Sequence, residues 1–138
     1  MNSASVVSMT TKTILVIEDE RNVRDIVQFC LEDLAGWNVL AVSSALEGLQ
    51  RAALARPDAI LLDISMPEMD GFMFLEVLRN NSQTQAIPVV LVSAKARWLD
   101  PQILQKYQVA GAIAKPFDVI GFPSQLAKLL GWNFIPLS

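Results

Sequence analysis

The chain has 138 residues, of which 52% are hydrophobic and 18% charged, and its net charge is −3. This length fits one domain that buries about 68 to 70% of the surface exposed by the unfolded chain. The 11 basic residues are scattered without a Lys/Arg run, so direct nucleic-acid binding lacks its usual electrostatic footprint. Histidine is absent, which excludes Ser-His and Cys-His hydrolases and any phosphohistidine on this chain.

The composition also bears on redox chemistry and location. Cys30 is the single cysteine, so a disulfide or a multi-thiolate metal site within the chain is excluded. No apolar stretch reaches the length of a membrane span, and residues 1–12 lack the features of a signal peptide. We therefore expect a cytoplasmic protein without membrane insertion. Residues 1–11 are small and polar, and we expect a flexible N-terminal leader.

From Lys12 onward, short β-branched runs alternate with longer segments whose apolar residues recur three and four positions apart. This alternation is typical of repeated strand-helix units, and it predicts an α/β fold whose parallel sheet is covered on both faces. The predicted strands are 13–17, 38–42, 59–62, 89–92 and 112–114. The predicted helices are 22–34, 45–55, 71–79, 101–108 and 123–130.

Several helix boundaries carry capping signals. Ser44 followed by Glu47 is a capping box for the second helix. Asp70 is expected to cap the third helix, and Asp100, followed by a proline, the fourth. Pro123 and the glycine two residues before it place the start of the last helix late.

Polar side chains follow four of the predicted strands, at the point where each strand ends. They are Glu18 and Asp19 after the first strand, Asp63 after the third, Ser93 after the fourth and Lys115 after the fifth. Parallel strands end at the same edge of a sheet, where open α/β folds bind their ligands. We therefore expect carboxylates, a hydroxyl and an ammonium to converge in one small volume.

This group of side chains points to a particular chemistry. Like-charged carboxylates repel, and among their sequence neighbours only Arg21 offsets them. A hard cation would make the cluster tolerable, and oxygen ligands favour Mg²⁺ or Ca²⁺. Lys115 would complement the charge of a phosphoryl group, and Ser93 could donate a hydrogen bond to it. Asp63 at the centre is the natural nucleophile, because a carboxylate can accept a phosphoryl group.

Four segments resemble the receiver domain of response regulators, and the resemblance extends over about residues 12–131. They are ILVIEDE at 14–20, LLDISMPEMDG at 61–71, VSA at 92–94 and AKPF at 114–117. The second segment is highly specific. The resemblance implies a three-layer α/β/α fold of flavodoxin-like type, with five helices and a five-stranded parallel sheet in the strand order 2-1-3-4-5.

The resemblance also implies roles for the site residues. Asp63 would accept a phosphoryl group from the phosphohistidine of a histidine kinase or phosphotransfer protein. Ser93 and Lys115 would contact the phosphoryl oxygens. The implied ligands of Mg²⁺ are Asp19, Asp63 and the backbone carbonyl of Ser65, with Glu18 acting through water.

The chain departs from the family pattern at two places. Ala112 stands where the family usually has an aromatic residue that turns inward, so the usual ring switch is missing. The late start of the last helix alters the face through which family members commonly dimerise, and we expect a monomer or a weak homodimer. The tail 132–138 is apolar and is expected to pack against the last helix.

The leading hypothesis is a phosphoacceptor of a two-component pathway that signals to a downstream protein by contact, since no effector segment follows residue 131. It would assist its own phosphorylation and dephosphorylation without being an enzyme in the usual sense. The alternative is a protein-binding module of the same fold that no longer uses phosphate, which Ala112 favours and the full polar set opposes. A dehalogenase-type phosphatase needs a carboxylate where Ser65 stands. A flavodoxin-like flavin carrier would have its phosphate repelled by residues 18–20.

Overall fold

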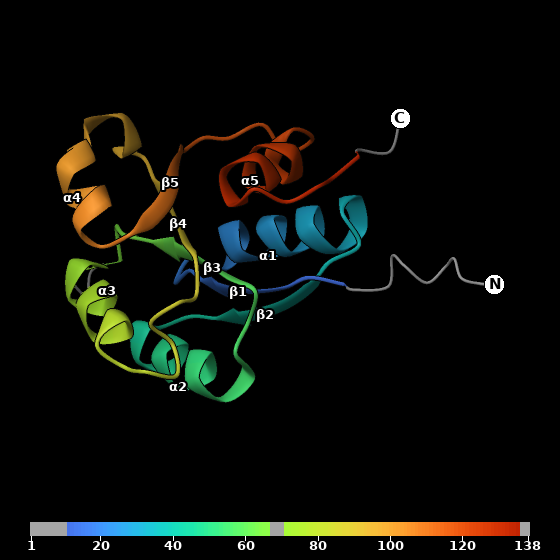
Figure 1. Cartoon of the computed structure of the whole chain (residues 1–138). Helices are drawn as coiled ribbons and strands as arrows, with labels where there is room; N and C mark the ends of the chain where they lie inside the picture. Colours follow the sequence, from blue (N-terminus) through green and yellow to red (C-terminus); the bar gives the residue numbers. More distant parts are fainter. Residues whose placement is uncertain (1–10, 67–70, 136–138) are drawn as a thin grey trace.

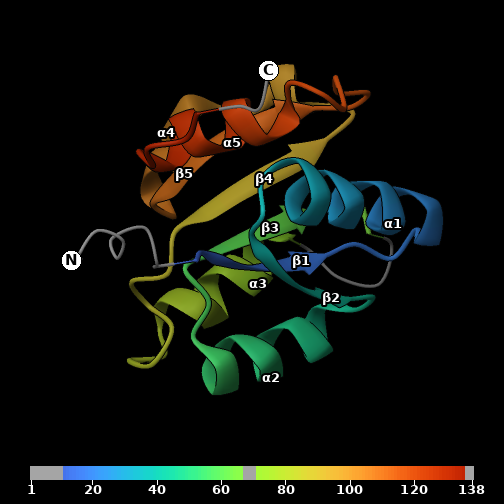
Figure 2. The same ribbon diagram turned by 90° about the vertical axis from the view of Figure 1, so that its right-hand side faces the viewer.

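The computed structural model describes residues 11–66 and 71–135, which form a parallel sheet between two layers of helices (Figures 1 and 2). The sheet has five strands in the order β2-β1-β3-β4-β5, and every neighbouring pair is parallel. The predicted three-layer fold and strand order are confirmed. Most of the expected leader and the expected cap Asp70 lie outside the described residues.

The strands lie close to their predicted positions, with one exception. They are β1 Thr13–Ile17, β2 Asn38–Val42, β3 Ala59–Asp63, β4 Val89–Ser93 and β5 Val109–Ala114. β5 begins three residues before its predicted start, because the chain turns at Gln108, which has a left-handed φ of 57°, and not at Gly111. Gly111 lies inside the strand, where a Cβ atom would come within 2.6 Å of the Leu129 side chain.

The helices also follow the prediction, with differences near their ends. They are α1 Arg21–Phe29, α2 Ala45–Ala55, α3 Gly71–Arg79, α4 Pro101–Lys106 and α5 Phe122–Leu130. The predicted helix 22–34 finishes in a π-helical segment, η2, at Cys30–Leu34. The predicted helix 101–108 ends early because Tyr107 and Gln108 leave the helical conformation. A short 3₁₀ segment, η3, at Ala96–Trp98 was not predicted.

Two of the predicted caps are present. Ser44 Oγ accepts a hydrogen bond from the backbone N–H of Glu47 at 3.2 Å. The Glu47 carboxylate accepts from the N–H of Ser43 at 3.4 Å, one residue earlier than in a standard capping box. Asp100 Oδ1 accepts from the N–H of Gln102 at 2.9 Å, and Pro101 occupies the first helical position as predicted.

The core is divided by the sheet into two clusters, because successive strand residues point to opposite faces. One cluster lies under α2, α3 and α4 and contains Leu15, Ile17, Leu62, Leu91 and Phe74. The other lies under α1 and α5 and contains Ile14, Val16, Leu61, Val90 and Phe122. Every residue of β3 and β4 is buried, as expected for central strands.

The first residues of the apolar tail contact the last helix, as predicted, and also an aromatic residue that the prediction did not include. Trp132 donates its N–H to the carbonyl of Ala127 in α5 at 2.9 Å. The rings of Trp132 and Phe134 then both lie 5.3 Å from the ring of Trp37, which precedes β2. The tail therefore starts against α5 and also covers the η2–β2 junction, because Trp37 offers an aromatic surface there. In the described part of the chain, none of the helices combines the length and the apolarity that a membrane crossing requires.

Candidate functional site

Three carboxylates meet where β1 and β3 end. Glu18 and Asp19 directly follow β1, and Asp63 is the last residue of β3. One oxygen atom from each carboxylate lies within 4.8 Å of the others. The structure thus brings together the three acidic residues that the sequence analysis selected.

The three carboxylates differ in exposure, for a backbone reason. The N–H of Glu18 donates to the carbonyl of Val42 at 3.1 Å, which extends the β1–β2 pairing by one residue and draws Glu18 into the fold. Glu18 and Asp63 are only 3% and 5% exposed, while Asp19, one residue further along, is exposed. The cluster therefore has two buried members and one member open to solvent.

Lys115 enters this cluster from the loop after β5. Its Nζ atom lies 3.0 Å from Glu18 Oε1 and 3.2 Å from Asp63 Oδ2, so it pairs with both buried carboxylates. The backbone N–H of Lys115 donates to the carbonyl of Ser93 at 3.0 Å, which fixes its position beside β4. The peptide bond between Lys115 and Pro116 is cis. The structure places Lys115 where the sequence analysis expected it.

Asp63 is stabilised as a carboxylate by its neighbours. Its Oδ1 atom accepts hydrogen bonds from the backbone N–H of Ser65 at 2.9 Å and from the Ser65 hydroxyl at 2.6 Å. Burial raises the pKa of Asp63, but these hydrogen bonds, one from Glu18 and the charge of Lys115 together lower the pKa below its ordinary value. Asp63 is therefore ionised near neutral pH, as a nucleophile must be.

Glu18 behaves in the opposite way. Burial is the main cause that raises the pKa of Glu18 to about 7, and the hydrogen bond with Asp63 adds to it, while Lys115 opposes both. The cluster thus resists full ionisation. Carboxylate oxygens are the ligands that Mg²⁺ prefers, and a divalent cation would remove this resistance. The donor set therefore fits a magnesium ion.

Ser93 is the last residue of β4 and is 3% exposed. It follows Val92, the register partner of Asp63, so it lies beside the carboxylate cluster. Its Oγ atom accepts a hydrogen bond from the N–H of Lys95 at 3.0 Å, which leaves the hydroxyl proton free to be donated. Among the described hydrogen bonds, none joins Ser93 to Asp63.

The sequence analysis missed two supporting residues and chose one wrongly. Arg21 lies 3.9 Å from Asp25 on the exposed face of α1 and does not offset the cluster. Arg24 does lie against the acidic turn: its Nη1 atom donates to the carbonyl of Glu18 at 3.0 Å and to that of Asp19 at 3.4 Å. The i to i+4 spacing from Glu20 to Arg24 was the available signal. Ser65 was expected only as a carbonyl ligand, and its hydrogen bonds to Asp63 were not foreseen.

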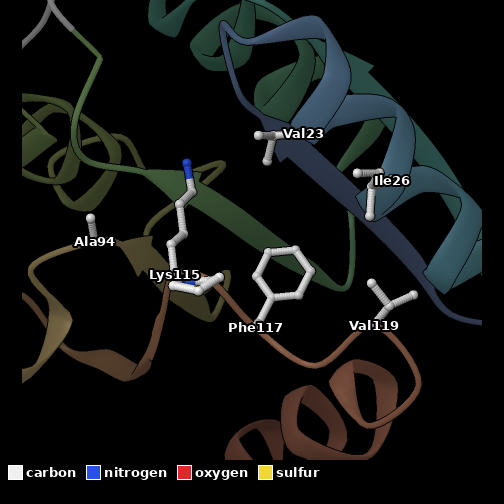
Figure 3. Close-up of a pocket in the computed structure, with 7 residues that line it drawn as sticks. Val23, Ile26, Ala94, Lys115, Phe117 and Val119 are labelled. Carbon is white, nitrogen blue, oxygen red and sulfur yellow. The ribbon is translucent and has the colours of Figure 1, made fainter.

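An apolar groove of about 340 Å³ borders the pocket. Val23 and Ile26 of α1 form one wall, Phe117 and Val119 of the β5–α5 loop form the other, and Lys115 lies at one end (Figure 3). Ile26 is 45% exposed, which is high for an isoleucine beside a polar site. The groove and the carboxylate cluster therefore share Lys115.

Comparisons with known proteins all point to the same family. Residues 14–126 match the response regulator receiver domain family. The chain is 30% identical over 125 residues to the polar-differentiation response regulator DivK of Brucella ovis, and the match covers 88% of this chain and 98% of DivK. Two longer regulators from Synechocystis are 34% and 33% identical over 77% and 85% of this chain, but the chain spans only 46% and 48% of their length.

Solved structures share the fold. The chemotaxis response regulator CheY4 of Vibrio cholerae superposes with a TM-score of 0.79 and 28% identity, covering 87% of this chain and 99% of CheY4. The receiver domain of the sensor histidine kinase PA1611 from Pseudomonas aeruginosa, with a magnesium ion coordinated in its active site cleft, superposes with a TM-score of 0.76 and 24% identity, covering 88% and 99%. The family match, the DivK relative and the strand order agree: this chain belongs to the response regulator receiver domain family of two-component signalling.

Proposed function

We propose that this receiver domain is a phosphoacceptor in a two-component phosphorelay. Asp63 takes a phosphoryl group from the phosphohistidine of a histidine kinase or phosphotransfer protein in a Mg²⁺-dependent reaction, and the domain signals to a downstream protein by contact. One observation carries this proposal: a carboxylate held ionised by Ser65 lies 3.2 Å from Lys115 in a pocket with two more carboxylates.

Magnesium would be held by Asp19, Asp63 and the backbone carbonyl of Ser65, with Glu18 acting through water. Two observations support this ligand set. The three carboxylate oxygens lie within 4.8 Å of one another, and the PA1611 receiver domain has magnesium in its cleft. When bound, the ion would neutralise charge on the phosphoryl oxygens.

Asp63, Lys115 and Ser93 would each have a separate role in the phosphoryl transfer. An Asp63 oxygen forms the new bond to phosphorus while the bond from phosphorus to the donor's imidazole nitrogen breaks, and that nitrogen keeps the electron pair. The Lys115 ammonium pairs with the transferred oxygens. Ser93 donates its free hydroxyl proton to one of them. This step needs alignment and charge neutralisation, both of which a preformed pocket supplies.

The groove beside Lys115 supports a protein as the phosphoryl donor. Because Lys115 lines both the groove and the carboxylate cluster, a donor that presents a phosphohistidine to Asp63 would have this groove beside it. Its walls are mostly apolar, as in the centre of a protein interface.

The acceptor is tested by labelling with acetyl phosphate and Mg²⁺. We expect Asp63→Asn to abolish the phosphorylated species on a phosphate-affinity gel while the far-UV circular dichroism spectrum is unchanged. Asp25→Asn, an exposed carboxylate of α1, is the matched control and should be labelled like the wild type. Labelling of Asp63→Asn would show that the acceptor is another residue.

The donor surface is tested by two matched substitutions. Ile26→Glu places a charge in the groove, and we expect it to slow transfer from a phosphohistidine donor at least tenfold without changing labelling by acetyl phosphate. Leu54→Glu on α2, at a position that is 82% exposed, should change neither rate. Equal slowing by both substitutions would remove the groove from the donor interface.

The alternative, a protein-binding module that works without phosphate, draws on Ala112. This residue lies in β5 and packs against the cluster under α4, so that strand position offers no ring to turn. A wild-type chain that forms no adduct with acetyl phosphate or beryllofluoride would favour the alternative. The domain limits 12–131, the cytoplasmic location and the state of monomer or weak homodimer stay predictions.

A further inference from the structure

We propose that Arg24 is a positioning residue for the cation site: it holds the Glu18–Asp19 turn so that the Asp19 carboxylate faces Asp63. The proposal rests on the proposed function, because it concerns the Mg²⁺ that this function requires. It gives helix α1 a role in cation binding in addition to the role of the three carboxylates.

Asp19 is the carboxylate that most needs an outside support. Glu18 is held by Lys115 and by the N–H of Glu20, and Asp63 by Lys115 and Ser65. In contrast, the Asp19 side chain is exposed, and within the described residues no hydrogen bond reaches its carboxylate. Among the described contacts, the Asp19 carboxylate therefore depends on its backbone turn for its place near Asp63.

Arg24 fixes that backbone. Its guanidinium bridges the carbonyls of Glu18 and Asp19, at 3.0 Å and 3.4 Å from Nη1. The backbone N–H of Arg24 donates to the carbonyl of Glu20 at 2.9 Å. The side chain of Arg24 therefore projects from a hydrogen-bonded helical turn. The helix provides no other side-chain support here, since Glu20 at the N-cap makes no capping hydrogen bond.

Charge and geometry predict opposite effects of removing Arg24. A guanidinium near a cation site repels the cation, so a purely electrostatic role would make Mg²⁺ bind more tightly after the change Arg24→Met. A positioning role predicts weaker binding, because the Asp19 turn gains conformational freedom that binding must remove. The two roles are therefore distinguished by the sign of the effect.

Arg24→Lys is a second test that distinguishes the positioning role from the electrostatic role. Lysine keeps the charge, but its side chain is shorter than that of arginine, so its ammonium reaches the position of Nη1 between the two carbonyls less well. A positioning role gives Arg24→Lys an affinity between the wild type and Arg24→Met. An electrostatic role gives it the wild-type affinity.

The measurement is Mg²⁺ titration by isothermal calorimetry without any phosphoryl donor, together with the thermal unfolding midpoint. We expect the Mg²⁺ dissociation constant to rise about tenfold in Arg24→Met and less in Arg24→Lys. The matched control is Arg21→Met on the same helix, whose guanidinium pairs with Asp25 among the residues that the structure describes, and its affinity should equal that of the wild type. Saturating Mg²⁺ should return the rate of acetyl phosphate labelling in Arg24→Met to near the wild-type value.

The Mg²⁺ affinities of these variants decide whether Arg24 positions the cation site. Unchanged or tighter Mg²⁺ binding in Arg24→Met overturns the proposal, and so does equal weakening in Arg21→Met. If Arg24→Met does not fold, Arg24→Lys with wild-type unfolding decides alone, weaker binding supporting the proposal and unchanged binding overturning it. Wild-type protein that binds no Mg²⁺ overturns this proposal together with the proposed function. If Asp63→Asn is still labelled, the acceptor is another residue, and the Mg²⁺ affinities of the Arg24 variants still test the positioning role.

Discussion

Helices α1 and α4 both follow a strand end that lines the pocket, but they are attached to the fold in different ways. α1 and its π-helical continuation bury Val27, Cys30 and Leu31 in the core. Among the six residues of α4, none is buried. The helix next to the acidic turn is thus held by a buried apolar face, while the helix beyond Ser93 contributes only the half-buried Leu104 to the core.

α4 is instead held at its two ends. Asp100 caps its first turn, and the Arg79 guanidinium of α3 donates to the carbonyls of Tyr107 and Gln108 just after its last turn, at 3.0 and 3.1 Å. The ring of Tyr107 also stacks on Phe72, with 5.8 Å between the centroids. These restraints are a few hydrogen bonds and one ring contact at the surface, which cost less to rearrange than a buried face.

This difference suggests separate roles for the two sides of the pocket. The α1 side keeps the proposed cation ligands in place, and the α4 side is the part of the pocket's surroundings that can change its packing when Ser93 moves. Because Ala112 offers no ring to transmit that movement, we expect the backbone from Ala94 to Asp100 to carry it to α4.

The largest effect should come from breaking the α1 side. Leu31 is fully buried in η2, so Leu31→Ala should lower the free energy of unfolding by about 2 to 5 kcal/mol. Leu104→Ala in α4 removes the same atoms from a half-buried site and should cost about 1 kcal/mol. Urea denaturation of both variants measures the difference. Equal losses would mean that α4 is held by its apolar face after all.

A smaller effect should follow from releasing α4 at its C-terminal end. Arg79 donates to four carbonyls, those of Gln85, Ile87, Tyr107 and Gln108. Arg79→Met leaves them without these partners and should cost about 1.5 to 3 kcal/mol. Hydrogen exchange should become faster in residues 101–108 and stay unchanged in α1. Arg51→Met, at an exposed position of α2, is the control without either effect.

Elements with clear apolar limits were predicted well on both faces of the sheet: α2 and α3 have their predicted bounds, whereas α1 begins one residue early and ends in η2. The β1 and β2 ranges were predicted to the residue, because apolar runs with clear limits decide where a buried strand lies. The limits of α4 and β5 were wrong because they depend on a left-handed Gln108, and a non-glycine residue gives no signal for that conformation. β3 and β4 each include one polar residue more than predicted, Asp63 and Ser93, since these belong to the pocket and are buried with it.

The candidate site was predictable in its members but not in its supports. Strand ends alone indicated which carboxylates, hydroxyl and ammonium meet, since parallel strands end at one edge. The pairing of Lys115 with both Glu18 and Asp63 depends on the direction in which its side chain packs, which the sequence does not show. The Arg24 and Ser65 hydrogen bonds likewise belong to local turns that composition and periodicity do not describe.

The pH dependence of stability should show that the α1 side contains a buried carboxyl group that resists ionisation. The pKa of Glu18 is raised from its ordinary 4.5 to about 7, so its contribution to stability is fully present below pH 4.5 and is lost as the pH rises through about 7. Without Mg²⁺, Glu18→Gln should therefore be more stable than the wild type at pH 8, by up to about 3 kcal/mol, and not at pH 4. Urea denaturation at both pH values measures this difference. A gain of the same size at pH 4 would exclude ionisation of Glu18 as its cause.

The smallest effect should come from the helix caps. α1 has no side-chain cap at Glu20, whereas Asp100 caps α4 with a hydrogen bond of 2.9 Å to Gln102 N–H. Asp100→Ala should therefore cost about 1 kcal/mol, while Glu20→Ala should cost less than about 0.5 kcal/mol. Because α4 has no buried face to compensate for a lost cap, hydrogen exchange after Asp100→Ala should become faster within α4 alone. Faster exchange throughout the domain would mean that α4 unfolds only together with the core, and α4 would then be no more independent than α1.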